Sequence, residues 1–213
     1  MIKKLIANVN YDGLRNLLSQ YPALANEGIA FDENNTTKAH PLHRICDGVF
    51  NNVYTDAEAV EMAEIFLEFG ANIEGFGLVE KKDTPLVAAA SLHADEVALL
   101  YIENGANIHH IGCHGGTPLH WAAWCGRDKV VERLLKEKLD INKHCIDFKS
   151  TPLFWAMHGL KNGGEKNRHH QEKCIQMLIE AGADKNIPNA EGATIFDLLE
   201  ENDIALKKIL FDT

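Results

Sequence analysis

The residues best suited to chemistry gather in one short stretch, GCHGGTPLHWAAWCG, which begins at Gly112. It contains Cys113, His114, His120 and Cys125. Cysteine thiolate and histidine imidazole are ligands that zinc binds in proteins, and a cysteine beside a histidine base can act as a nucleophile. The stretch therefore raises two hypotheses, a metal or redox centre and a catalytic site.

The spacing of these residues weakens both hypotheses. No two of the five cysteines have the C-x₂₋₄-C spacing with which zinc modules begin, and their odd number disfavours a disulfide framework. No nucleophile elbow, phosphate loop or HExxH motif is present, so we expect a non-enzyme without cofactor or bound metal. One alternative stays open, a metal- or thiol-redox-responsive protein that uses Cys113, His114, Cys125 and Cys145.

Composition and charge narrow the classes of partner. Of 213 residues, 46% are apolar, which is enough for a core, and the net charge is −10. An acidic chain disfavours nucleic acid and anionic membranes, whose phosphates attract lysine and arginine, and favours a partner with a basic surface. No apolar run is long enough for a membrane span or a signal peptide, so we expect a cytoplasmic protein.

The elements that position the stretch belong to a repeat. The tetrapeptide TPLH of residues 117–120 recurs as HPLH, TPLV and TPLF, and as the more divergent TIFD. Pro85 and Pro118 are 33 residues apart, and Pro118 and Pro152 are 34 apart. A second marker follows in phase, as GANI twice, then KLDI and GADK. Self-similarity at a fixed period predicts a repeat architecture.

This pattern closely resembles the ankyrin repeat, a unit of about 33 residues with a β-turn, two helices and a T-P-L-H-x-A signature. The resemblance covers nearly the whole chain and implies an all-α repeat solenoid of stacked helix-turn-helix units with short β-hairpin loops. We expect a single ankyrin domain over 1–213, capped at both ends. The approximate units are 1–39 (N-terminal cap), 40–82, 83–115, 116–149, 150–192 and 193–213 (C-terminal cap).

Each part of the repeat has a physical reason. A hydroxyl such as that of Thr117 caps a helix whose first position, Pro118, has no N–H to satisfy. Gly105 and Gly182 follow the second helix, where glycine takes the left-handed conformation freely. Lys138 replaces glycine in the repeat between them, and we expect this departure to cost about 1 kcal/mol.

Two repeats carry insertions between their helices, DGVFNNVYTD and HGLKNGGEKNRHH. The second is rich in Gly, Asn and Lys and predicts an exposed loop. In ankyrin arrays this turn lies beside the concave face, so the insertions are expected to widen that surface. The alternative is neutral drift, because long surface loops cost little free energy.

Alignment to the repeat assigns structural roles to several of the cysteine and histidine residues. His120 is the histidine of the signature, and the resemblance implies that it bonds locally and braces the loop. Cys46 falls at a small buried position that alanine occupies in other repeats, and Cys174 at a position of valine. Both cysteines are predicted to be core residues, because a free cysteine behaves as a small hydrophobe.

The resemblance also implies where a partner binds, at the hairpin tips and just after the paired alanines of the first helix. Trp124 is the notable residue there, since tryptophan is enriched among residues that dominate binding energy. Its alternative role is internal packing under the LKNGGEKNRHH insertion. The residues at the implied partner-binding positions are Glu80, Lys81, Asp83, Ser91, Leu92, Cys113, His114, Trp124, Cys125, Asp147, Phe148, Ser150 and His158.

The sequence therefore predicts a monomeric, non-catalytic scaffold that binds a protein partner on its concave face. A narrower alternative is a bacterial toxin-neutralising or host-directed ankyrin protein, since small ankyrin chains of those kinds occur in bacteria. The repeat reports architecture and does not name a partner.

Overall fold

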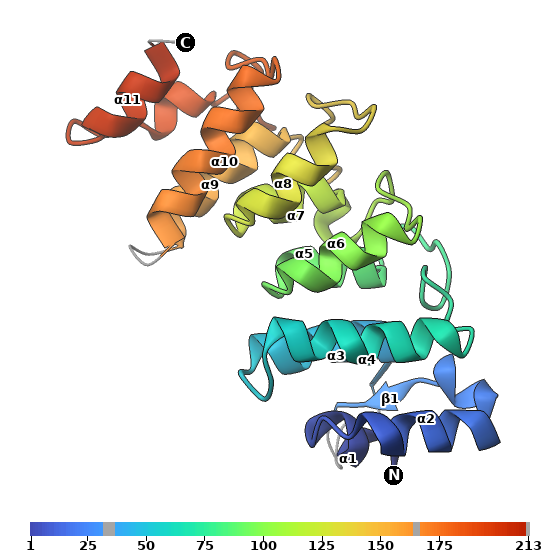
Figure 1. Cartoon of the computed structure of the whole chain (residues 1–213). Helices are drawn as coiled ribbons and strands as arrows, with labels where there is room; N and C mark the ends of the chain where they lie inside the picture. Colours follow the sequence, from blue (N-terminus) through green and yellow to red (C-terminus); the bar gives the residue numbers. More distant parts are fainter. Residues whose placement is uncertain (32–36, 164–166, 212–213) are drawn as a thin grey trace. The chain divides into compact units, whose positions relative to one another are not determined.

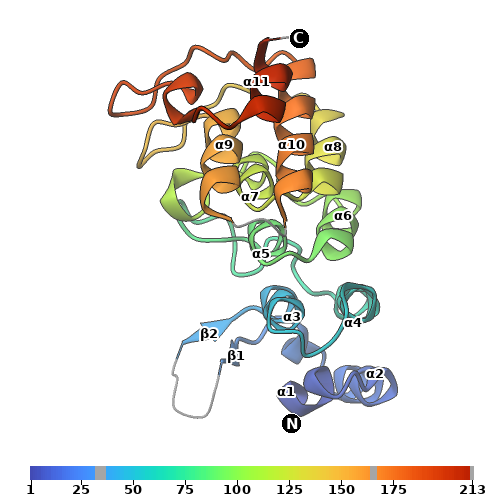
Figure 2. The same ribbon diagram turned by 90° about the vertical axis from the view of Figure 1, so that its left-hand side faces the viewer.

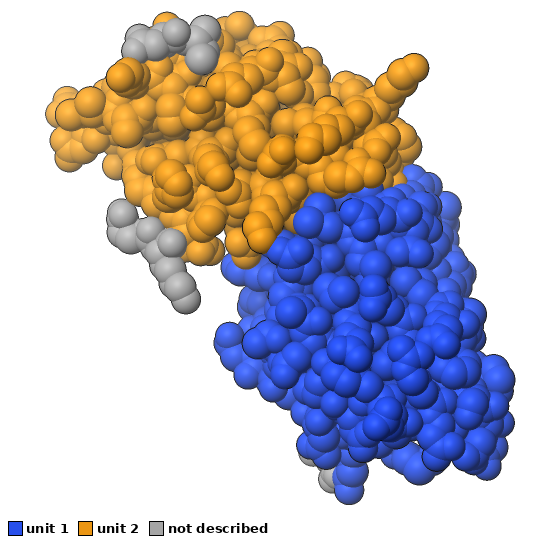
Figure 3. Space-filling model, viewed as in Figure 1, with its two compact units in different colours: residues 1–79, 83–107 blue, residues 80–82, 108–213 orange. Residues whose placement is uncertain are grey.

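The computed structural model describes residues 1–31, 37–163 and 167–211 and shows an all-α repeat fold (Figure 1). The described residues form eleven α-helices and one two-stranded sheet. The chain divides into two compact units, coloured in Figure 3. Unit 1 comprises Met1–Val79 and Asp83–Asn107, and unit 2 comprises Glu80–Lys82 and Ile108–Thr213. The division into six repeats with caps stays a prediction.

Unit 1 contains six α-helices, of which α3 packs on α4 and α5, and α4 packs on α6. Two helices, α1 and α2, form the N-terminal part of the unit. A short hairpin pairs β1 with β2, Ile29 opposite Ala39. The elements are α1 (Ile2–Ala7), α2 (Tyr11–Gln20), η1 (Pro22–Ala25), β1 (Ile29–Ala30), β2 (Lys38–Ala39), α3 (Pro41–Phe50), α4 (Asp56–Glu68), α5 (Pro85–Ser91) and α6 (Asp95–Glu103).

Unit 2 repeats the same helix pair. Figure 2 shows α8, α10 and α9 side by side, and α7 packs on both α8 and α9. The elements are η2 (Cys113–Gly115), α7 (Pro118–Trp124), α8 (Asp128–Leu135), α9 (Pro152–Asn162), α10 (Arg168–Glu180), η4 (Ile195–Leu198) and α11 (Ile204–Phe211).

In four repeats the signature starts the first helix as predicted, with proline at its first turn. The Thr151 hydroxyl accepts the Phe154 N–H at 3.2 Å, and the His40 ring nitrogen accepts the Leu42 N–H at 3.3 Å. These side chains satisfy amides that the start of a helix leaves unbonded.

The core between helices is built from small and branched residues. Ala89, Ala90, Ala122 and Ala123 are fully buried, which lets the helix pairs approach closely. Cys46 and Cys174 are also fully buried, so the prediction that they are core residues is confirmed. Tyr101, Phe66 and Leu134 are among the large side chains that are fully buried.

The turns that follow the second helices differ between the repeats with glycine and the repeat with lysine. Gly70, Gly105 and Gly182 take φ values of 82°, 81° and 93°, the left-handed conformation expected there. Lys138 is absent from the residues with positive φ, so the expectation of a strained left-handed lysine is wrong. Helix α8 instead ends at Leu135, and the following turn is closed by the Glu137 N–H bonding the Leu134 carbonyl at 3.0 Å.

The insertions lengthen helices more than they add loop. Helix α3 has 10 residues and α9 has 11, whereas α5 and α7 have 7 each. Helices α4 and α10 have 13 residues, against 9 in α6 and 8 in α8. The prediction of an exposed loop over HGLKNGGEKNRHH is therefore wrong at both of its ends, which are helical, while its residues 164–166 lie outside the described part of the chain.

Candidate functional site: an aromatic groove

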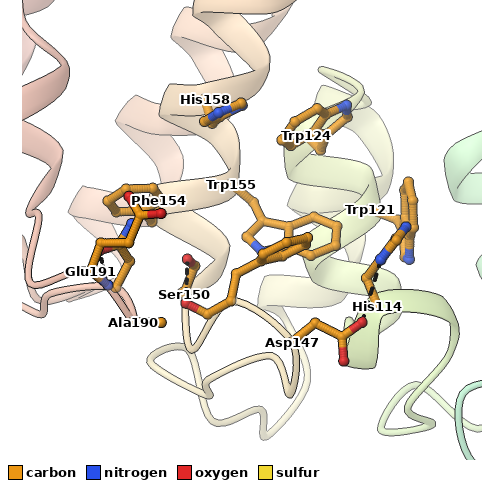
Figure 4. Close-up of a pocket in the computed structure, with 12 residues that line it drawn as sticks. His114, Trp121, Trp124, Asp147, Ser150, Phe154, Trp155, His158, Ala190 and Glu191 are labelled. Atoms are coloured by element: carbon orange, nitrogen blue, oxygen red, sulfur yellow. Dashed lines mark hydrogen bonds and ion pairs between the residues drawn. The ribbon is translucent and has the colours of Figure 1, made fainter.

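An open cavity of about 540 Å³ lies in unit 2 and is lined largely by aromatic rings (Figure 4). Helices α7 and α9 supply its floor and one wall, and three successive hairpin tips supply the rim. We call it the aromatic groove. Its lining residues are His114, Trp121, Trp124, Asp147, Phe148, Ser150, Phe154, Trp155, His158, Asn189, Ala190 and Glu191.

Trp155 forms the centre of the groove and is only 4% exposed. The Trp121 ring meets it at 5.1 Å between centroids and the Trp124 ring at 5.7 Å, both near-perpendicular. Phe148 lies 6.4 Å from it and is 49% exposed. Edge-to-face pairs of this kind stabilise one another beyond their buried area, so the floor is fixed while Phe148 faces solvent.

Trp124 is half-buried and is held from two helices. Its ring stacks on that of His158 in α9, with centroids 4.8 Å apart. Its carbonyl accepts the Gln171 side-chain N–H at 3.1 Å, and a Cβ on Gly159 would lie 2.1 Å from that carbonyl oxygen. Glycine is therefore required where α9 crosses the end of α7. Trp124 packs inside the unit and also lines the groove.

The hairpin tip around His114 is turned toward the groove by unusual backbone angles. His114 has φ 55° and Gly115 has φ 71°, the left-handed region that few residues adopt. A Cβ on Gly115 would lie 2.4 Å from the Ile146 backbone nitrogen, so the neighbouring hairpins touch. The His114 ring then lies 5.5 Å from that of Phe148 and 6.2 Å from that of Trp121.

Asp147 gives the rim a negative charge beside these rings. Its carboxylate forms an ion pair with Lys81 and lies 3.4 Å from His114 Nδ1. The hydrogen bond from Lys81, with a further one from His114, lowers the pKa of Asp147 below its ordinary value. Asp147 therefore stays ionised at neutral pH.

His120 lies beneath the groove and holds two hairpins in place. Its Nδ1 accepts the Thr117 N–H at 3.1 Å, and its Nε2 lies 3.1 Å from the Lys143 carbonyl and 3.3 Å from that of Ser150. Burial lowers the pKa of His120 to about 4. The ring is neutral, fully buried and used for structure, as the repeat predicted.

The comparison with known proteins agrees with this geometry. The family model for ankyrin repeats (3 copies) matches residues 52–147 and 115–189, more than half of the chain. The chain belongs to the ankyrin repeat family. Ankyrin repeats are generally protein–protein interaction modules and not enzymes, and some of the chain's relatives combine them with other domains.

Relatives of this ankyrin chain are much longer proteins. It is 33% identical over 118 residues to ANK repeat-containing protein nipk-1 of Caenorhabditis elegans, a match covering 53% of this chain and 19% of that protein. It is 30% identical to nuclear factor NF-kappa-B p105 subunit of Gallus gallus, a match covering 56% of this chain and 12% of that protein. It is also 30% identical to putative E3 ubiquitin-protein ligase protein PFF1365c of Plasmodium falciparum, a match covering 61% of this chain and 1% of that protein. The chain thus spans less than a fifth of the length of these relatives.

The aromatic groove of this ankyrin unit brings together six of the predicted partner-binding residues, namely His114, Trp124, Asp147, Phe148, Ser150 and His158. Four others, Glu80, Lys81, Cys113 and Cys125, lie in unit 2 outside the lining, although Lys81 bonds Asp147. Asp83, Ser91 and Leu92 belong to unit 1 and do not line it.

Sequence reasoning missed half of the lining. Trp121 and Trp155 are not among the predicted partner-binding residues; Trp155 is buried, but Trp121 is half-buried, and both line the groove. The tip 189–191 was not singled out, although it is the equivalent of the tips at His114 and Asp147 one or two repeats later. Counting tips by the repeat period was the signal that could have found it.

The proposed cysteine and histidine centre is not assembled. Among the residues that the structure describes, no group of three or more His, Cys, Asp or Glu side chains could hold a metal ion. Cys145 is 2% exposed, and its sulfur accepts the Ser150 N–H at 3.4 Å. The five cysteines all lie in the described ranges, and none of them forms a disulfide. These observations lend no support to a metal- or thiol-responsive role.

Of the helices in the described ranges, none combines the length and the apolar character that a bilayer crossing requires.

Proposed function

We propose that this ankyrin protein is a non-catalytic module that binds a partner protein in the aromatic groove of unit 2. The observation that carries the proposal is that all three tryptophans of the chain line one open cavity beside a half-exposed phenylalanine. Tryptophan and its aromatic neighbours dominate the binding energy of protein interfaces when a partner covers them.

The groove is suited to a partner segment because its rings are already held in place. Trp155, Trp121 and Trp124 pack on one another and on His158, so binding does not have to order them. A rigid surface loses little side-chain entropy on association. Covering about 100 Å² of aromatic surface contributes about 2.5 kcal/mol before the costs of association.

Charge supports a basic partner. The net charge of the chain is −10, and Asp147 and Glu191 are the charged side chains among the twelve described lining residues. Opposite charge on a partner accelerates encounter, most strongly at low salt.

Phe148→Ala tests the proposal, because this half-exposed ring is available to a partner and contributes less to the core than the tryptophans do. Partners captured by the intact chain from its native lysate are identified by mass spectrometry and measured again with the variant. We expect the specific partner to be lost.

Leu78→Ala is the matched control, since Leu78 is an exposed apolar side chain, 51% accessible, in unit 1. It should retain the partner. Equal recovery with Phe148→Ala and with the intact chain would show that the partner binds elsewhere.

A further inference from the structure

The aromatic groove combines open ring faces with acidic side chains, and no lysine or arginine is among its described lining residues. Among its twelve described lining residues, Asp147 and Glu191 are acidic and none is lysine or arginine. In Figure 4 these two carboxylates lie on opposite sides of Trp155. The face of an aromatic ring carries negative electrostatic potential and attracts cations. Rings and carboxylates in the same groove therefore favour the same kind of ligand.

The two carboxylates differ in their present partners. Asp147 is paired with Lys81 and lies near His114. The backbone of Glu191 is held by its N–H, which donates to Asn189 Oδ1 at 2.9 Å. No ion pair links the exposed Glu191 carboxylate to a residue in the described ranges. Glu191 is thus positioned at the rim and available to a cation from another molecule.

Unit 1 shows how this chain satisfies a similar combination of groups internally. Arg44 occupies the position directly after the signature, the position of Trp121 and Trp155 in unit 2. Its guanidinium lies 5.1 Å from the centroid of the Phe31 ring, forms an ion pair with Asp47 and donates to the Ile29 carbonyl at 3.1 Å. Ring, carboxylate and guanidinium form one set there. Unit 2 supplies rings and carboxylates at its groove and lacks the guanidinium.

We propose that the aromatic groove receives an arginine side chain of the partner, with its guanidinium over the exposed aromatic faces and its N–H groups toward Glu191. This inference rests on the proposed function and specifies the partner's chemistry. Arginine fits better than lysine because its planar cation stacks on rings and its several N–H groups match a carboxylate. A quaternary ammonium ion has no N–H group to donate to Glu191 at the rim. Such an ion binds inside a cage of exposed aromatic faces, and the central ring of this groove, Trp155, is almost fully covered.

The chain carries its own reporters for a test. All three tryptophans line the groove, so every indole N–H signal in a ¹⁵N–¹H spectrum comes from this site. The intact chain is titrated with N-acetylarginine amide and, in parallel, with N-acetylcitrulline amide, which has nearly the same shape and no charge. We expect indole shifts with the arginine probe and affinity at least about tenfold weaker for the citrulline probe.

Variants locate the contacts. Glu191→Gln and Phe148→Ala are each expected to weaken the arginine probe about threefold to fivefold, because exposed ion pairs and cation–ring contacts are modest. Glu201→Gln is the matched control, an exposed carboxylate of unit 2 outside the groove, and should leave the affinity unchanged.

Three outcomes would overturn the inference. They are the absence of indole shifts with the arginine probe, equal affinity for the citrulline probe, and tighter binding of N-acetyllysine amide or its trimethylated form. The proposed function fails separately, when Phe148→Ala retains its captured partner. If the captured partner depends on Phe148 but the arginine probe does not bind, then the proposed protein-binding function stands and the inference of an arginine ligand fails.

Discussion

The two units use the same repeat for different surfaces. At the position after the signature, unit 1 has Arg44 and Ala88, while unit 2 has Trp121 and Trp155. Arg44 is satisfied by groups of its own unit, and Ala88 is 1% exposed. The tryptophans instead form a groove that opens to solvent. The difference shows that this position tolerates residues of very different size and charge, because the helix is fixed by the signature next to it.

The two units also carry separate spectroscopic reporters. All four tyrosines, at positions 11, 21, 54 and 101, lie in unit 1, and all three tryptophans lie in unit 2. Tyrosine and tryptophan bands in near-ultraviolet spectra can therefore follow the unfolding of each unit separately. This makes the comparison between the units measurable.

His120→Ala in unit 2 is expected to have the largest effect. It removes a fully buried ring that bonds Thr117 and approaches the carbonyls of Lys143 and Ser150. Lost hydrogen bonds and a cavity together cost about 3 kcal/mol of unfolding free energy. Urea unfolding followed by tryptophan signals measures this loss.

His43→Ala is the matched variant in unit 1, at the same signature position. His43 is half-buried, so its removal loses less packing. We expect a loss of about 1 to 2 kcal/mol in unfolding free energy, measured by the tyrosine signals. Equal losses from the two variants would contradict the view that His120 has a special bracing role beneath the groove.

Gly159→Ala is expected to cost about 2 kcal/mol, because the new Cβ would lie 2.1 Å from the Trp124 carbonyl oxygen. Gly48 is its equivalent in unit 1, eight residues after the cap position in both repeats. A Cβ on Gly48 would lie 2.1 Å from the Tyr54 ring and hydroxyl, a side chain that can move further than backbone can. We expect Gly48→Ala to cost about 1 kcal/mol, partly offset by alanine's better helix propensity.

The indole N–H signals of these two variants in a ¹⁵N–¹H spectrum report on the groove. Gly159→Ala should shift the Trp124 indole signal, whereas Gly48→Ala should leave all three indole signals in place. Unchanged indole signals in Gly159→Ala would mean that α7 and α9 are not in the close contact described here.

The course of the first helices was predictable from the sequence because each position there has a local cause. Threonine or histidine caps the helix, proline begins it, and paired alanines permit close packing. The extra turns of α3 and α9 were not predictable in the same way. Residues such as Gly48 and Gly159 disfavour a helix locally, and only the packing of a neighbour over them explains why the helix continues.

The groove was only half predictable for a related reason. His114 and Phe148 stand at tips that the repeat marks as variable, so their exposure follows from register. The inclusion of Trp121 and of Glu191 depends on how far apart three successive tips stand, and that distance is set by contacts such as Gly115 against Ile146. Those contacts join residues about thirty positions apart, which no local pattern reports.

Acid is expected to destabilise unit 1 more steeply than unit 2. Burial, with a smaller contribution from His43, lowers the pKa of His40 to about 4, and burial also lowers the pKa of His43. In unit 2, burial lowers the pKa of His120 to about 4. A histidine with a lowered folded pKa stabilises fully above its unfolded pKa near 6.5, and this contribution is lost as the pH falls toward 4.

Between pH 7 and pH 4.5 we therefore expect the tryptophan-reported unfolding free energy to fall by about 2 kcal/mol. The tyrosine-reported value should fall further, because His40 contributes a loss of similar size and His43 adds to it. Urea unfolding at a series of pH values, with both signals recorded, measures the two slopes. In His40→Gln the slope of unit 1 should approach that of unit 2. A slope that this variant does not change would show that other groups govern the acid response.

Phe148→Ala should have the smallest effect on stability, within about 0.5 kcal/mol, because roughly half of its ring already faces solvent. Its carbonyl, which accepts the Ala190 N–H at 2.9 Å, is backbone and stays in place. Trp155→Phe, a smaller change of a buried ring on the same groove, should cost more, about 2 kcal/mol. Urea unfolding on far-ultraviolet circular dichroism compares the two variants without depending on tryptophan signals. If Phe148→Ala proves as costly as Trp155→Phe, then Phe148 supports the fold of unit 2, and the groove loses its best candidate for a residue kept for binding.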